Sequence, residues 1–164
     1  MTDLPWMVEA KRVLGRHETR DRSFLMKWLR SDGHTLGDPE KLPWCADFVE
    51  TSIRLGLPME TFTGPLAQNP YWARNWLGFG VPTPPTYGAV LVFARGIGGH
   101  VGFAVGQDYA NFYVLGGNQS NAVTVARIAR DRLLGARMPN SFAWSPKSLP
   151  TMRPGQSILT TNEA

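Results

Sequence analysis

Residues 42–49 have the sequence LPWCADFV, a stretch that starts a helix directly at a cysteine. The helical pattern extends over residues 44–55 and ends at Gly56, a residue type that favours a helix terminus. Its apolar spacing places Cys45 on the face that packs inward. Cys45 is the only cysteine among 164 residues, so it cannot form an intramolecular disulfide. Cys45 therefore serves either core packing or thiol chemistry.

Helical periodicity lies in the first half of the chain, and short β-rich runs lie in the second. The predicted helices cover residues 5–15, 21–31 and 44–55, with a short one from Asn69 to Leu77. The predicted strands cover residues 89–94, 100–106, 111–115, 122–128 and 133–137. This order predicts an α+β fold, in which N-terminal helices pack on an antiparallel sheet of about five to six strands.

The composition, with 43% hydrophobic and 18% charged residues, is typical of one globular domain. We expect that domain over residues 1–140 and a partly flexible tail, rich in Ser, Pro and Thr, over residues 141–164. The net charge of +4 comes from scattered basic residues, so we expect no nucleic-acid partner. Neither a signal peptide nor a transmembrane stretch is visible, which predicts synthesis in the cytoplasm and no stable membrane insertion.

His100 is the first candidate partner for the thiol. Because side chains alternate along a strand, His100 shares its face with Gly102, Ala104 and Gly106. A face of such small residues lets a helix approach closely. If the helix of Cys45 lies there, the thiol and the imidazole can meet.

The next strand offers a third polar residue. A hairpin turn centred on Tyr109 pairs Gly106 with Phe112 and places His100 opposite Asn118, at a Cβ separation of about 4.5–5.5 Å. A β-bulge would shift this register and bring Gly117 or Gln119 to His100 instead.

A Cys–His–Asn set performs acyl transfer from an amide. The helix N-terminus and a protonated imidazole both favour the thiolate of Cys45. His100 then protonates the leaving amine and later activates water, while Asn118 holds the ring in one orientation. The backbone N–H of Cys45 can stabilise the oxyanion. The alternative is structural, because a lone inward cysteine often serves packing alone.

Three sequence blocks resemble a known group of enzymes. Residues 43–49 (PWCADFV), 99–103 (GHVGF) and 114–123 (VLGGNQSNAV) are similar to the NlpC/P60–CHAP superfamily of papain-like cell-wall hydrolases, closest to a compact phage-associated branch. The resemblance covers roughly residues 4–139. It implies a papain-like α+β fold and hydrolysis of amide bonds in peptidoglycan, with Cys45 as nucleophile, His100 as base and Asn118 at the variable third position.

Asp47 departs from the pattern of the superfamily, where a small residue is more usual. An acid there opposes a thiolate, and it could contact substrate amines or point to solvent. The aspartate-rich calcium loop of some CHAP enzymes is absent before Cys45, so we expect no metal and no cofactor. We expect substrate contacts from Trp44, Asp47 and Gln119.

These expectations describe a monomeric, endolysin-like peptidoglycan hydrolase that reaches the wall or periplasm through a holin or membrane damage. A secreted antibacterial amidase effector would use the same chemistry. Two further alternatives are a zinc amidase using His17, His100 and Cys45, and an inactive tail or wall-binding module. The sequence leaves open whether the bond cut is muramoyl–alanine or lies within the peptides.

Overall fold

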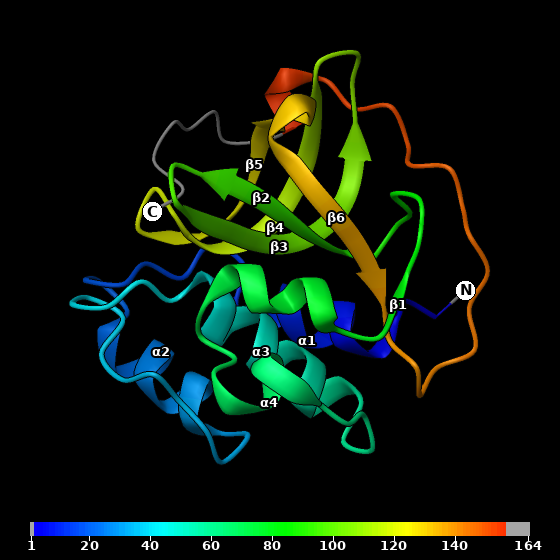
Figure 1. Ribbon diagram of the computed structural model, residues 1–164. Helices are drawn as coiled ribbons and strands as arrows, with labels where there is room; N and C mark the ends of the chain where they lie inside the picture. The colour runs from blue at the N-terminus through cyan, green and yellow to red at the C-terminus, as the bar shows by residue number, and fades with distance from the viewer. Residues whose placement is uncertain (1, 157–164) are drawn as a thin grey trace.

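The N-terminal half of the chain forms a layer of helices in the computed structural model, which describes residues 2–156 (Figure 1). These elements are α1 (Pro5–Arg12), α2 (Arg22–Arg30), α3 (Cys45–Gly56), α4 (Gly64–Gln68) and the 3₁₀ helix η1 (Ala73–Gly78). None of the helices in the described part of the chain is long and apolar enough to cross a membrane.

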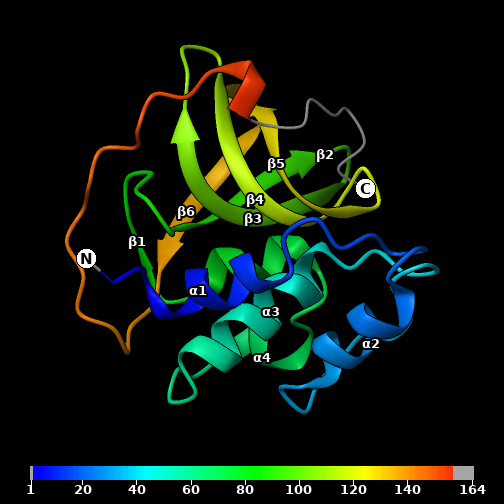
Figure 2. The same ribbon diagram turned by 180° about the vertical axis from the view of Figure 1, so that it is seen from behind.

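The C-terminal half forms one six-stranded antiparallel sheet. Its strands are β1 (Val81–Pro82), β2 (Val90–Arg95), β3 (Gly98–Gln107), β4 (Asn111–Gln119), β5 (Ala122–Ala129) and β6 (Leu133–Met138), in the spatial order β1-β6-β2-β3-β4-β5. Two short 3₁₀ turns, η2 (Arg130–Arg132) and η3 (Pro154–Gln156), complete the list of elements. The helices lie together on one side of the strongly curved sheet (Figure 1, Figure 2). The predicted α+β, papain-like architecture is confirmed.

Helix α3 lies at the centre of the helical layer, and a glycine lets α1 cross it closely. Every residue from Cys45 to Ile53 is buried. At Gly56 a Cβ atom would come within 2.6 Å of the backbone of Trp6, so only glycine permits this approach. Helix α3 is therefore buried on all sides over its first nine residues.

Helix α3 contacts the sheet at Gly117 of β4. A Cβ there would lie 2.7–2.8 Å from the Trp44 ring and the Cβ of Phe48, so the missing side chain makes room for the start of the helix. The small face of β3 has a different use from the predicted one. Gly102 faces Val114, and Gly106 faces Met152 of the C-terminal segment. The expectation that this face receives the cysteine helix is therefore wrong.

The segment after β6 runs along the outside of the molecule (orange in Figure 1) and is attached at several points. The buried carboxylate of Glu60 accepts hydrogen bonds from the N–H groups of Asn140 and Ser141, at 3.1 and 2.8 Å. Farther on, Leu149 is buried, and Thr151 forms a parallel bridge with Gln107 of β3. The predicted boundary at residue 140 stays a prediction, and residues 157–164 of the predicted tail lie outside the described residues.

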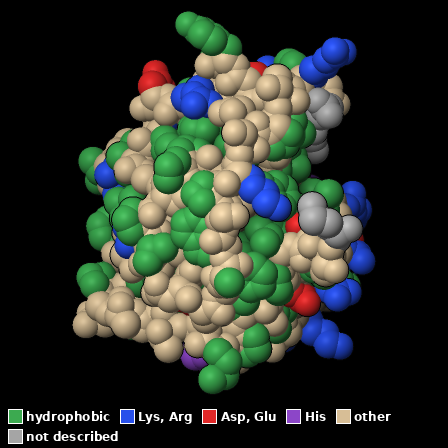
Figure 3. Space-filling view, turned by 90° about the vertical axis from the view of Figure 1, so that its right-hand side faces the viewer, with side chains coloured by type: hydrophobic (Ala, Val, Ile, Leu, Met, Phe, Trp, Pro, Cys, Tyr) green, Lys and Arg blue, Asp and Glu red, His purple; other side chains and the backbone are tan. Residues whose placement is uncertain are grey.

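A cavity of about 580 Å³ lies between this segment and the N-terminal residues. Asp3, Lys11, Tyr87 and Trp144 are among its lining residues. Figure 3 looks onto the side along which the segment runs and shows many hydrophobic side chains there. The Asp3 carboxylate accepts hydrogen bonds from Lys11 at 2.7 Å and Tyr87 at 3.0 Å, so the charges of Asp3 and Lys11 pair with each other.

Candidate active site

Cys45 is the first residue of α3, and its sulfur lies where β3 and β4 separate. The ladder between these strands ends at the pair Phe103–Leu115, so Val101 lies two residues beyond it. Paired residues on β2 and β3 alternate between hydrogen-bonded and non-hydrogen-bonded pairs, starting from Arg95–Gly98 at the two-residue turn. Val101 falls in a non-hydrogen-bonded pair, so its N–H points away from β2. The sulfur of Cys45 accepts a hydrogen bond from this N–H.

The environment of Cys45 favours the neutral thiol. Only 5% of the residue is exposed, and this burial raises the pKa of the thiol above its ordinary value. The N–H groups of Val101 and Ala46 and the positive charge of Arg95 lower the pKa, but by less. Burial thus opposes the thiolate expected at the helix N-terminus, and the sulfur holds its proton near neutral pH until a base removes it.

His100 is fully buried on β3, and the amide of Gln119 holds its ring. The His100 Nε2 and Gln119 Oε1 atoms are 2.9 Å apart. The Gln119 Nε2 donates to the carbonyls of Val114 at 3.1 Å and Thr124 at 2.8 Å, which fixes the amide oxygen toward the imidazole. His100 Nε2–H must therefore be the donor, and the lone pair of the neutral ring lies on Nδ1.

A β-bulge brings Gln119 to the imidazole. The register between β4 and β5 shifts between Gly116 and Gln119, and Asn118 has a left-handed backbone with φ of 56°. Gly116 makes this arrangement possible, because a Cβ there would come within 2.5 Å of the Gln119 Oε1. Asn118 is itself buried, next to Gln119 in the bulge. Asn118 was predicted at the third catalytic position, and Gln119 is thus a competing candidate for that position.

The register of β3 and β4 follows the prediction only in part. Phe103 pairs with Leu115, as in the register that pairs His100 with Asn118. The predicted pair of Gly106 with Phe112 is wrong, because a shift after Ala104 pairs Gly106 with Tyr113.

Trp44 lies in the wall of the site and is almost completely buried. The residue is 1% exposed, and its indole N–H donates to the Glu18 carboxylate at 2.7 Å. The ring covers Gly117 of β4. This position favours a role in holding the start of α3 over the predicted contact with substrate.

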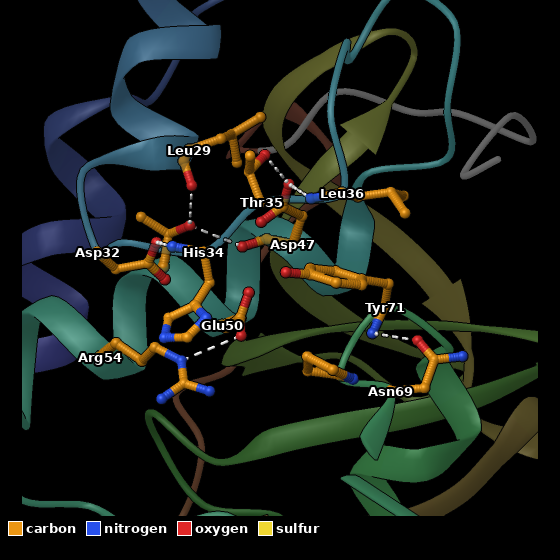
Figure 4. Close-up of polar contacts among 12 residues, drawn as sticks. Leu29, Asp32, His34, Thr35, Leu36, Asp47, Glu50, Arg54, Asn69 and Tyr71 are labelled. Atoms are coloured by element: carbon orange, nitrogen blue, oxygen red, sulfur yellow. Dashed lines mark hydrogen bonds and ion pairs between the residues drawn. The ribbon is translucent and has the colours of Figure 1, made fainter. Parts of the chain in front are cut away.

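Asp47 is also inside the protein, two residues after the cysteine. Its Oδ2 accepts hydrogen bonds from the Thr35 hydroxyl at 2.9 Å and the Leu36 N–H at 3.0 Å, as Figure 4 shows. Burial, together with the charges of Glu50 and Asp32, raises the pKa of Asp47 to about 7. The carboxyl group therefore ties the loop before the cysteine to the first turn of α3, and it is fully buried instead of pointing to solvent.

Two more acids accompany Asp47 behind the first turn of α3. Glu50 accepts a hydrogen bond from Arg54 at 3.0 Å, and Asp32 accepts one from the His34 N–H at 3.0 Å (Figure 4). Burial raises the pKa of both carboxyl groups. Asp32 and Glu50 were not singled out in the sequence, because their proximity depends on how the loop folds over α3.

Within residues 2–156, no three His, Cys, Asp or Glu side chains are grouped so that they could hold a metal ion. His17 lies in an isolated bridge with Ala122, and its Nδ1 accepts a hydrogen bond from the Thr19 N–H at 3.1 Å. The set of His17, His100 and Cys45 that a zinc amidase would need is thus not brought together.

Comparison with known proteins identifies the family of this chain. No curated protein matches the chain significantly. The family model described as the CHAP domain matches residues 37–118, which is half of the chain and includes both Cys45 and His100. The match indicates a peptidoglycan hydrolase or amidase type of activity. On this match, together with the α+β architecture, the chain belongs to the CHAP domain family.

Proposed function

We propose that this protein hydrolyses an amide bond of peptidoglycan, with Cys45 as nucleophile and His100 as general base. The observation that carries the proposal is the position of the Cys45 sulfur at the N–H of Val101, directly beside His100 in β3. The Gln119 amide fixes the His100 ring in the tautomer that a base needs. The CHAP domain match supplies the substrate class.

The acylation step starts from a neutral thiol. The Nδ1 atom of His100 accepts the proton of Cys45 as the sulfur attacks the carbonyl carbon of the amide. The N–H of Cys45, in the first turn of α3, donates to the oxygen that becomes negative. The C–N bond then breaks, and the leaving amine takes the proton from His100. The product of this half-reaction is a thioester on Cys45.

The deacylation step restores the free enzyme. His100 removes a proton from water, and the oxygen of that water attacks the thioester carbon. The C–S bond breaks, the acid product leaves, and the sulfur recovers the proton from His100. Throughout both steps Gln119 accepts the hydrogen bond from His100 Nε2–H, so it acts as a positioning residue, a role the sequence had assigned to Asn118.

The biological setting that we propose is that of a monomeric, endolysin-like enzyme. The chain carries a net charge of +4, which suits an anionic wall. A holin or membrane damage would give the enzyme access to the wall. A neighbouring holin gene would support this setting, whereas a neighbouring immunity gene would indicate a secreted effector of the same chemistry.

Mass spectrometry of digested sacculi tests the activity and identifies the bond. The wild type is compared with Cys45→Ala and His100→Ala. Glycan strands and intact peptides released only by the wild type would indicate an amidase, and shortened peptides an endopeptidase. Inhibition by iodoacetamide but not by a chelator is expected. No released product from the wild type would overturn the proposed function and favour a wall-binding module.

A further inference from the structure

The hairpin between β2 and β3 presents Arg95 beside the catalytic residues. Gly96 has a φ of 57° and starts a two-residue turn, as in a type II′ hairpin. Phe93 pairs with His100 in this hairpin, so their side chains share one face of the sheet. Arg95 follows Phe93 by two residues and therefore lies on the same face as His100.

Two other arginines hold the hairpin in place. Arg74 of η1 donates to the carbonyls of Gly98 at 2.7 Å and Gly96 at 3.1 Å. Arg132 of η2 donates to the carbonyl of Ala94 at 3.0 Å. Both guanidinium groups bind backbone oxygens of the hairpin and so hold its end in place.

Arg95 differs from these two arginines because its guanidinium contacts no backbone oxygen of the hairpin among residues 2–156. The side chain is exposed, and among residues 2–156 it forms no hydrogen bond and no ion pair. Its charge nevertheless acts on the buried thiol of Cys45. Ile97, at the tip of the same hairpin, is 100% exposed, so this rim of the site is open to a large substrate.

We propose that Arg95 determines specificity by binding a free carboxylate of the peptide whose amide bond Cys45 attacks. This inference rests on the proposed function and narrows its substrate class to acidic peptides with a carboxylate close to the scissile bond. A guanidinium binds a carboxylate through two parallel N–H···O bonds, which fixes the peptide in orientation as well as in charge. Within the described part of the chain no acceptor occupies the donors of Arg95, and the bonds from Arg74 and Arg132 hold the backbone of the hairpin in place.

Steady-state kinetics on two matched soluble fragments of peptidoglycan test this inference. One fragment keeps its peptide carboxylates free, and the other has them converted to amides. The enzymes are the wild type, Arg95→Ala, Arg95→Lys and the control Arg30→Ala, which removes an exposed arginine at the end of α2. For Arg95→Ala we expect KM on the free-acid fragment to rise about 10-fold or more, since a hydrogen-bonded charge pair is lost.

The amidated fragment separates binding from an effect on the thiol. On it we expect Arg95→Ala and the wild type to have equal KM values, and Arg95→Lys to lie between them on the free acid. An equal loss on both fragments would overturn the inference, because Arg95 would then act only through its field at Cys45. So would unchanged kinetics on the free acid. If the wild type cleaves neither fragment and releases nothing from sacculi, the proposed function itself fails.

Discussion

Gln119 links the imidazole of His100 to two backbone carbonyls, so its replacement tests how this imidazole is oriented. In Gln119→Ala the Nε2–H of His100 loses its acceptor inside the protein. We expect kcat to fall about 10- to 100-fold, equivalent to the 1–3 kcal/mol cost of an unpaired buried polar group, with KM little changed. The pH profile of kcat should move as well, because the loss changes the proton affinity of the ring.

The matched control for this prediction is Asn118→Gly. Asn118 has a positive φ, so glycine keeps the backbone of the bulge while it removes the side-chain amide. We expect this variant to retain most of the activity. A large loss in Asn118→Gly with full activity in Gln119→Ala would instead assign the third catalytic position to Asn118.

The raised pKa of Asp47 predicts how the stability of the protein depends on pH. The pKa of Asp47 is raised to about 7 by burial, whereas the ordinary pKa of an aspartate in an unfolded chain is 3.8. The folded state therefore favours the protonated acid, and stability is lost as the pH rises from about 4 through 7. Asp47→Asn keeps an oxygen for the Leu36 N–H without this charge. The free energy of unfolding, measured by urea titration, is compared between the variant and the wild type. The variant should gain stability relative to the wild type at pH 8 more than at pH 5.

The neighbouring acids set the limits of that experiment. The pKa values of Glu50 and Asp32 are also raised, so the pH dependence should decrease in Asp47→Asn without vanishing. Asp131→Asn is the control, because Asp131 is exposed and its loss should leave the slope unchanged. The same slope in Asp47→Asn and the wild type would contradict the prediction.

At the level of elements, the contact between α3 and β4 depends on the missing side chain of Gly117. In Gly117→Ala the new methyl group would lie 2.7–2.8 Å from Trp44 and Phe48, so the first turn of α3 must move. We expect a loss of about 1–3 kcal/mol in the free energy of unfolding, together with reduced activity, because Cys45 lies in that turn. Gly78→Ala is the control, since nothing lies within 4 Å of a Cβ at that position. Equal losses in the two variants would show that close packing at Gly117 is not the cause.

The helices and most strands could be predicted because their patterns are local. The predicted helix over residues 44–55 corresponds to Cys45–Gly56, and the strand over 122–128 to Ala122–Ala129. The helix predicted from Asn69 is wrong, because the Asn69 side chain accepts a hydrogen bond from the Tyr71 N–H and forms a turn. The 3₁₀ helix η1 begins only at Ala73.

The third residue of the site could not be fixed from the sequence, because the bulge depends on contacts between distant residues. Gln119 reaches His100 only where Gly116 leaves space and where the carbonyl of Thr124, on the next strand, binds its amide. Arg95 could not be recognised from its residue type either, since its place near Cys45 follows from the pairing of β2 with β3. Cys45 and His100 could be proposed as candidates from the sequence, because a thiol and an imidazole indicate their chemistry without knowledge of their neighbours in the fold.

The segment after β6 connects both layers of the fold. The rings of Phe142 and Trp6 of α1 meet edge to face at 5.3 Å, and Gln107 of β3 pairs with Thr151. Between these points the Thr86 hydroxyl donates to the carbonyl of Lys147 at 2.8 Å. These contacts predict that residues 140–152 stabilise the folded domain.

Two truncated chains test where the stable domain ends. A chain that ends at residue 139 loses the buried Leu149 and leaves the carboxylate of Glu60 without the donors of Asn140 and Ser141. We expect its free energy of unfolding in urea to fall by at least about 2 kcal/mol, the value of one buried leucine. A chain that ends at residue 156 keeps all of these contacts and should be more stable than the shorter chain by this amount. If the shorter chain is equally stable, the domain ends near residue 140 as the composition predicts, and the contacts of residues 140–152 add no net stability.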